Sequence, residues 1–132
     1  LGLAHSPRIV TDGLVFYIDA GNTKSYPGSG TTWTDISGNG NNGTLQSMST
    51  ANYSSVNGGC LDFDATSNDH VNFSSEMFNP NSDFTISSYV NLDLISATHT
   101  IVSTENSSGS FQLRYKSGTG VQIVDSFVTD VG

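Results

Sequence analysis

The sequence predicts an all-β protein, an antiparallel sandwich of jelly-roll type, and three observations support this class. Several short stretches alternate apolar and polar residues, as strands with one buried face do. Groups of Gly, Asn, Ser and Pro, such as YPGSG and NPNSD, separate these stretches with turn signals. Good helix formers do not cluster anywhere, because β-branched residues, Gly, Asn and Ser dominate. Short strands punctuated in this way indicate a sandwich or a barrel.

The first half of the chain contains four predicted strand regions. GLVFYIDA (13–20) is apolar on both faces, which is typical of a strand covered on both sides. Strands around Trp33 and Leu45 are expected on either side of SGNGNNGTL. Further along, CLDFDA and HVNFSS alternate, and the residues expected to point inward are Leu61, Phe63, Val71 and Phe73.

The second half gives the clearest strand pattern. In FTISSYVNL (84–92), one face carries Phe84, Ile86, Ser88, Val90 and Leu92. HTIVSTE, SFQLRYKSG and VQIVDSFV follow, separated by turn signals. The middle one of these three is expected to point Phe111, Leu113 and Tyr115 inward.

Composition limits the possible functions. The chain has 132 residues, which fits one domain, and its 35% hydrophobic residues are enough for a core. The net charge is −8 with only four basic residues, so the chain cannot form the basic face that nucleic acid needs. Binding to an anionic membrane is disfavoured for the same reason. No apolar run approaches the ~20 residues of a membrane-spanning helix.

Cys60 is the single cysteine, so no disulfide can form within the sequence. Small secreted domains usually depend on disulfides, so this composition favours folding in a reducing cytoplasm followed by assembly or release. Cys60 adjoins a strand-like alternation, and we expect it to be a small buried apolar residue.

SGNGNNGTL (37–45) has the glycine content of a linker or of a phosphate-binding loop. A phosphate loop needs a lysine and a following helix, and neither is present. Apolar residues flank the stretch on both sides, which argues against a flexible linker. We therefore predict an ordered series of turns in which Gly38, Gly40 or Gly43 adopts a positive φ.

The motifs GLVFYIDAGNTKSYPGSGTTWTDISGNGNNGTL, NGGCLDFDATSNDHVNFSS and DFTISSYVNL occur in this order. Together they resemble the laminin-G-like members of the concanavalin A-like lectin/glucanase superfamily, over roughly residues 9–92. The variant is similar to virion structural proteins of tailed phages, notably marine and cyanobacterial ones. The resemblance implies an N-terminal arm (1–12) and a β-sandwich (13–132) with further strands expected after Gly132.

The resemblance implies a non-enzymatic structural protein at the virion surface. Such a protein would decorate or cement the capsid, or belong to a tail appendage. Its expected partners are copies of itself in a symmetric multimer and other capsid or tail proteins, with host-surface glycans as a further candidate. The arm is a candidate for reaching a neighbouring subunit, or it packs across one end of the sandwich.

Two other functions stay open at the sequence level. One is a carbohydrate-binding module of a larger secreted glycoside hydrolase. The other is a glycosidase within this chain, because Asp62 and Asp64 have the i, i+2 spacing of paired carboxylates on one strand face. No acid partner accompanies them, so a solvated strand face is the favoured interpretation.

Two binding sites are predicted. Asp64, Asn68 and Asp69 offer oxygen ligands in one loop, where pentraxin-like relatives place calcium, the only cofactor expected; the alternative is an Asx turn that caps its own backbone. Tyr26 and Tyr53 are the aromatic candidates for stacking on a glycan, Tyr26 because its turn would expose it. Trp33 lies in a strand-like alternation and is expected in the core.

Overall fold

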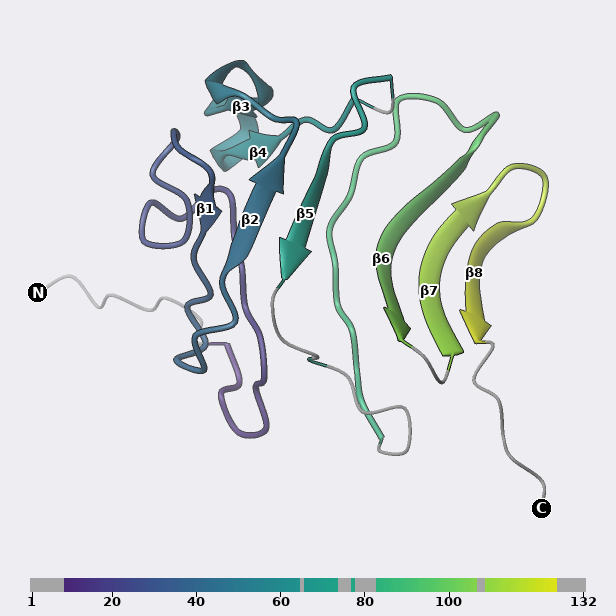
Figure 1. The fold of residues 1–132 in the computed structure, drawn as a ribbon, viewed down its shortest axis with the longest axis horizontal. Helices are drawn as coiled ribbons and strands as arrows, with labels where there is room; N and C mark the ends of the chain where they lie inside the picture. The colour runs from purple at the N-terminus through teal and green to yellow at the C-terminus, as the bar shows by residue number, and fades with distance from the viewer. Residues whose placement is uncertain (1–8, 65, 74–76, 78–82, 107–108, 126–132) are drawn as a thin grey trace, which may run out of the picture. The chain divides into compact units, whose positions relative to one another are not determined.

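A computed structural model describes residues 9–64, 66–73, 77, 83–106 and 109–125. The chain divides into two compact units, Leu1–Met77 and Phe78–Gly132, and each is considered by itself (Figure 1). In the described residues of both units the strands form antiparallel sheets, and the first unit also has two short 3₁₀ turns, so the all-β prediction is confirmed. No helix in the described part of the chain is long and apolar enough to cross a membrane.

The first unit is built on a three-stranded sheet with the order β1-β2-β5, made of Thr32–Trp33, Gly43–Gln46 and His70–Phe73. β2 pairs antiparallel with β5, so that Leu45 lies opposite Val71 and Gly43 lies opposite Phe73. A second, two-stranded sheet joins β3 (Tyr53–Ser54) to β4 (Cys60–Leu61). The 3₁₀ turns η1 (Thr50–Asn52) and η2 (Val56–Gly58) precede these two strands.

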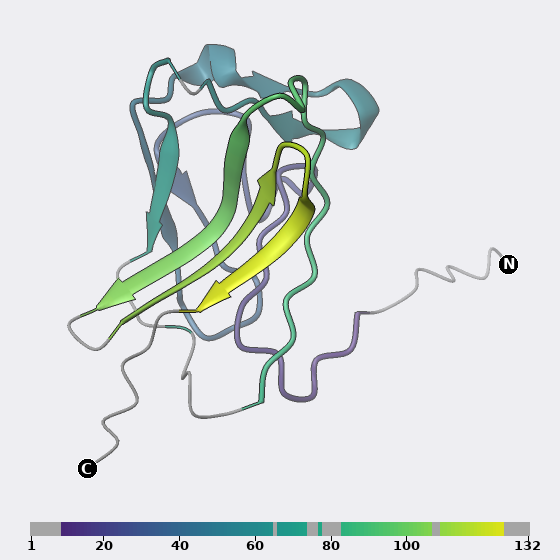
Figure 2. The same cartoon turned by 90° about the vertical axis from the view of Figure 1, so that its right-hand side faces the viewer.

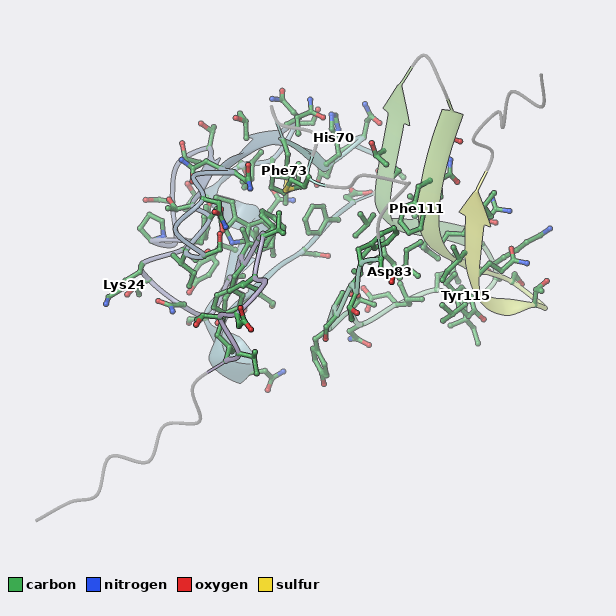
Figure 3. The ribbon with its side chains drawn as sticks, turned by 90° about the horizontal axis from the view of Figure 1, so that it is seen from below. Lys24, His70, Phe73, Asp83, Phe111 and Tyr115 are labelled. Carbon is green, nitrogen blue, oxygen red and sulfur yellow. The ribbon has the colours of Figure 1, made fainter. Side chains whose placement is uncertain are left out.

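The core of the first unit combines apolar side chains with buried polar ones. Leu45 is buried on β2, and Phe16 packs edge-on against Phe73 with ring centroids 4.9 Å apart. Gly43 is also buried, because a Cβ there would come within 2.5 Å of Val71 Cγ1 and 2.6 Å of the Phe73 ring. The side chains of Val71 and Phe73 therefore fill the space beside Gly43. Figure 3 labels Phe73 on this sheet and Lys24 on an exposed loop.

The second unit is a three-stranded antiparallel meander, β6-β7-β8 (Figure 2). The strands are Thr98–Asn106, Gly109–Lys116 and Gly120–Asp125, close to the three predicted regions. Residues facing each other across the ladder share a face of the sheet. One face carries Phe111, Leu113 and Tyr115, with Val121 and Ile123 beside them. Of the three residues predicted to point inward, Phe111 is buried and Leu113 and Tyr115 are half-buried, whereas Val121 and Ile123 are 71% and 70% exposed. Phe111 is 7% exposed and packs edge-on against Phe84.

Two predicted strands are absent from the described residues. Residues 13–20 form no regular strand, because side chains of the 35–41 loop form hydrogen bonds with their backbone N–H and carbonyl groups. Residues 84–92 are also irregular, although their alternation gave the clearest strand pattern. A strand needs a hydrogen-bonded neighbour, and β6 pairs only with β7. Tyr89 in this segment is fully exposed.

Two predicted burials are wrong. Cys60 is exposed, and Phe63 is 45% exposed, because β4 ends at Leu61 and its alternation does not continue. The jelly-roll sandwich itself is not confirmed, since the strands form three separate small sheets. The arm and sandwich boundaries of the prediction do not coincide with the division into two units, and residues 1–8 of the arm lie outside the described residues.

Candidate functional site

The most connected polar group of the first unit is the carboxylate of Asp35, which is 6% exposed. Its Oδ1 accepts the backbone N–H of Tyr17 at 3.0 Å and of Ser37 at 2.9 Å. Its Oδ2 accepts the Ser37 hydroxyl at 2.8 Å and the backbone N–H of Asn41 at 3.0 Å. Two donors on each oxygen give this anion the hydrogen bonds that a buried charge requires.

The loop that follows Asp35 binds a distant stretch of backbone through its side chains. Asn39 Nδ2 donates to the carbonyl oxygens of Leu14 and Val15 at 2.9 and 3.0 Å. Asn41 Nδ2 donates to the same Val15 carbonyl at 3.0 Å. These side chains provide some of the hydrogen bonds that a neighbouring strand would otherwise provide to the backbone of residues 14–17. Residues 14–19 therefore have backbone hydrogen bonds without belonging to a sheet.

The turns of this loop have the predicted conformations at two of three glycines. Gly38 has a φ of 97° and Gly40 a φ of 77°, both in the left-handed region that favours glycine. The third, Gly43, is a strand residue whose lack of a side chain serves close packing instead. The prediction of an ordered turn series is therefore confirmed. We refer to residues 35–42, held by the Asp35 carboxylate, as the Asp35 knot.

Electrostatics favour the ionised form of Asp35. Burial by itself would raise the pKa of this carboxyl, but the hydrogen bonds from Tyr17, Ser37 and Asn41 together lower it below 3.8. An acid with a lowered pKa and fully used lone pairs is a poor general base or nucleophile at neutral pH. The arrangement is suited to fixing the backbone rather than to proton transfer.

The predicted calcium ligands form a self-capped turn. Asp64 Oδ1 accepts both the backbone N–H and the hydroxyl of Thr66, each at 2.7 Å. Those hydrogen bonds lower the pKa of the exposed Asp64 carboxyl. Asp69 Oδ2 accepts the Asp64 N–H at 3.0 Å and Asn52 Nδ2 at 2.8 Å. Asn68 has a φ of 58°, which Asn adopts more readily than most residues.

This turn fits calcium poorly as it is arranged. The ion takes six to eight oxygens, whereas both Asp64 oxygens face Thr66 and Ser67 within the turn. Asp69 Oδ1 is buried without a hydrogen-bond partner in the described part of the chain, so it is an oxygen that a ligand could satisfy. Across the described residues, no three His, Cys, Asp or Glu side chains lie close enough together to hold a metal ion. The Asx-turn alternative describes the loop better.

The two tyrosines predicted to bind a glycan lie together but differ in exposure. Tyr26 is 0% exposed, and its hydroxyl donates to the Gly30 carbonyl at 3.0 Å, so the prediction that it is exposed is wrong. Burial, and then the neighbouring Tyr53, raise its pKa. Tyr53 is half-buried, with its ring 5.5 Å from the Tyr26 ring and in contact with Gly28. Tyr53 alone of the pair presents part of its ring to solvent.

The other residues singled out from the sequence do not form a second site in the described part of the chain. Asp62 and Asp64 both follow the end of β4, so the strand spacing that would align their carboxylates does not apply. Trp33 lies on β1 and is half-buried, and its Nε1 is buried without a partner. Asp35 was not among the predicted site residues, although its place before Ser-Gly is the pattern of a carboxylate that caps a turn.

Comparison of the chain with protein-family models, curated proteins and solved structures finds no match. The class that the fold and site define is therefore a coarse one: an all-β chain whose first unit is organised by a buried, hydrogen-bonded carboxylate.

Proposed function

We propose that this chain is a non-enzymatic structural protein of a tailed-phage virion, exposed on the capsid or on a tail appendage. The proposal starts from the order of the sequence motifs, above all TDISGNGNNGTL within the first unit. The Asp35 knot is the observation that supports a structural task for this motif. Its four donors leave the carboxylate no free lone pair for chemistry, and it ties residues 14–17 to residues 35–41.

The surface chemistry is consistent with this role. The chain carries a net charge of −8 and 12% charged residues, so Ser, Thr, Asn and Gly form much of its polar content. Such a composition, without a disulfide, suits assembly in a reducing cytoplasm and later exposure outside the cell. Virion components occur in many copies, so the protein would contact copies of itself and other capsid or tail proteins in a symmetric arrangement.

The test is to locate the chain in intact particles. Purified virions are imaged by cryo-electron microscopy to side-chain resolution, and the map is searched for the tyrosine pair Tyr26–Tyr53 beside the Asp35 knot. We expect repeated copies at symmetry-related positions on the particle surface. A protein that is absent from particles and sediments as a monomer would refute the proposal.

Tyr53 favours a second candidate, a glycan-binding surface. Tyr53 is half-buried, and its ring centroid lies 5.5 Å from that of the buried Tyr26, which gives it a neighbouring aromatic ring to pack against. Titration of the protein with a panel of host-surface oligosaccharides, read by calorimetry, tests this function. Loss of binding in Tyr53→Ala, with binding retained in Tyr53→Phe, would support it, whereas no heat with any glycan would count against it.

A further inference from the structure

The sequence contains three Asn-Gly pairs, Asn39-Gly40, Asn42-Gly43 and Asn57-Gly58. Asn-Gly is the dipeptide in which the following backbone nitrogen most easily reaches the asparagine side chain, because glycine has no Cβ to obstruct it. The reaction needs a free side-chain amide and a backbone that can rotate. Local structure therefore decides which of three chemically equal sites reacts.

Two of the pairs are held by the Asp35 knot. Asn39 Nδ2 lies within 3.1 Å of three acceptors, the carbonyls of Leu14 and Val15 and the Ser37 hydroxyl. Asn42 Oδ1 accepts the Asp35 N–H at 2.9 Å. The glycine after Asn42 is buried in β2 opposite Phe73. Rotation at either site would break several of these contacts.

Asn57 is in a different environment. It is exposed, and it lies with a φ of 57° in the turn that joins β3 to β4. Among the described residues, no hydrogen bond is found for its side-chain amide. The turn is held by the 3₁₀ hydrogen bonding of η2, in which Gly59 N–H donates to the Val56 carbonyl at 3.2 Å, and by Val56 N–H, which donates to Ser54 Oγ at 3.2 Å. Val56, Asn57 and Gly58 are all exposed, so opening the turn removes no buried side chain from the core.

We propose that Asn57 is a site of spontaneous covalent modification, deamidation through a cyclic imide. The Gly58 nitrogen attacks Asn57 Cγ, a C–N bond forms, the bond from Cγ to Nδ2 breaks, and ammonia leaves with the Gly58 amide proton. A water molecule then opens the ring at one of its two carbonyls. The products are an aspartate or an isoaspartate at position 57, each with one additional negative charge.

The product would alter a tight contact within the first unit. A Cβ on Gly21 would overlap the Gly58 carbonyl oxygen, and a Cβ on Gly59 would lie 2.6 Å from Gly21 Cα. The turn therefore lies directly against the backbone at Gly21. An isoaspartate lengthens the backbone by one carbon between residues 57 and 58, so it must displace that carbonyl. An aspartate keeps the backbone length and should disturb the contact less.

The experiment follows all three sites in the same sample. The full chain is incubated at physiological temperature and mildly alkaline pH, and aliquots are digested and analysed by peptide mass spectrometry and isoaspartyl methyltransferase labelling. In folded protein, Asn57 should react at least about tenfold faster than Asn39 or Asn42, which corresponds to ~1.4 kcal/mol of additional local opening at the protected sites. In urea the three rates should converge, because all have the same following residue.

Two variants distinguish the reaction at Asn57 from the protection that the Asp35 knot gives to Asn39 and Asn42. Asn57→Gln should abolish the fast reaction and leave the slow ones unchanged. Asp35→Asn should speed the reactions at Asn39 and Asn42 and leave the Asn57 rate unchanged. Equal rates at the three sites in folded wild-type protein would overturn the proposal. So would an Asn57 rate in folded protein at least about tenfold below its rate in urea, because the turn would then protect this residue.

Discussion

The carboxylate of Asp35 accepts the backbone N–H of Tyr17 at 3.0 Å, across 18 residues of sequence. Next to it, the Ile36 N–H donates to the Tyr17 carbonyl at 2.8 Å. Tyr17 thus receives one side-chain bond and one backbone bond from the start of the Asp35 knot. These two bonds fix the backbone at Tyr17, which belongs to no strand.

Asp35→Asn should destabilise the first unit by about 2–4 kcal/mol, because the new amide puts N–H groups against the N–H of Ser37 or Asn41 in a buried site. Urea denaturation followed by tyrosine and tryptophan fluorescence measures the change. The control is Asp12→Asn, an exposed carboxylate, for which we expect a change within about 0.5 kcal/mol. Equal losses of unfolding free energy in the two variants would show that the buried Asp35 carboxylate stabilises the unit no more than an exposed carboxylate does.

Stability should fall on acidification in a way that depends on Asp35. The pKa of this carboxyl is lowered in the folded state, so the unfolded chain binds more protons at pH values near and below the ordinary value of 3.8. The contribution is fully present above the unfolded pKa and is lost as the pH falls through the folded pKa. Urea midpoints measured from neutral pH downward should fall more steeply for wild type than for Asp35→Asn. Parallel curves would contradict this.

Gly43→Ala should destabilise the first unit by about 1–3 kcal/mol through overpacking, since its Cβ would meet Val71 and Phe73 at 2.5–2.6 Å. Thermal unfolding measures the loss. The double variant Gly43→Ala, Val71→Ala creates room and should recover part of it relative to the sum of the single changes. If the stability losses of the two single variants simply add up in the double variant, the loss in Gly43→Ala does not arise from its contact with Val71.

Tyr26→Phe should cost about 1 kcal/mol, because it removes the buried hydroxyl that donates to the Gly30 carbonyl. Tyr53→Phe is the matched control in the same aromatic pair, with a half-buried ring and an expected change within about 0.5 kcal/mol. Chemical denaturation distinguishes the two. A larger loss in Tyr53→Phe would mean that the buried hydroxyl bond is not the stabilising one.

Calcium should leave the unfolding temperature unchanged. The oxygens of Asp64 cap Thr66 and Ser67, so binding would have to break the turn first. Scanning calorimetry with millimolar calcium or with chelator makes the comparison, since a ligand that binds only the folded state raises the transition. A calcium-dependent rise that disappears in Asp69→Asn would instead support the predicted metal site through its unpartnered Oδ1.

The sequence predicted the local features that depend on a few neighbouring residues. The pattern of apolar and polar residues between turn signals located β5 and the meander β6–β8. Glycine content located the turns at Gly38 and Gly40, where a positive φ is required. The capping role of Asp64 follows from the same local chemistry, since its acceptor reaches a donor two residues away.

Tertiary structure decided the features that depend on distant partners. Residues 13–20 look like a strand, but their backbone groups are bound by Asp35, Asn39 and Asn41, which lie some twenty residues later. Residues 84–92 alternate as a strand does, yet β6 offers them no ladder. Tyr26 lies in a turn sequence and is nevertheless buried. Periodicity reports which face of a segment is apolar, whereas hydrogen-bond partners and burial are set by what the rest of the chain brings against it.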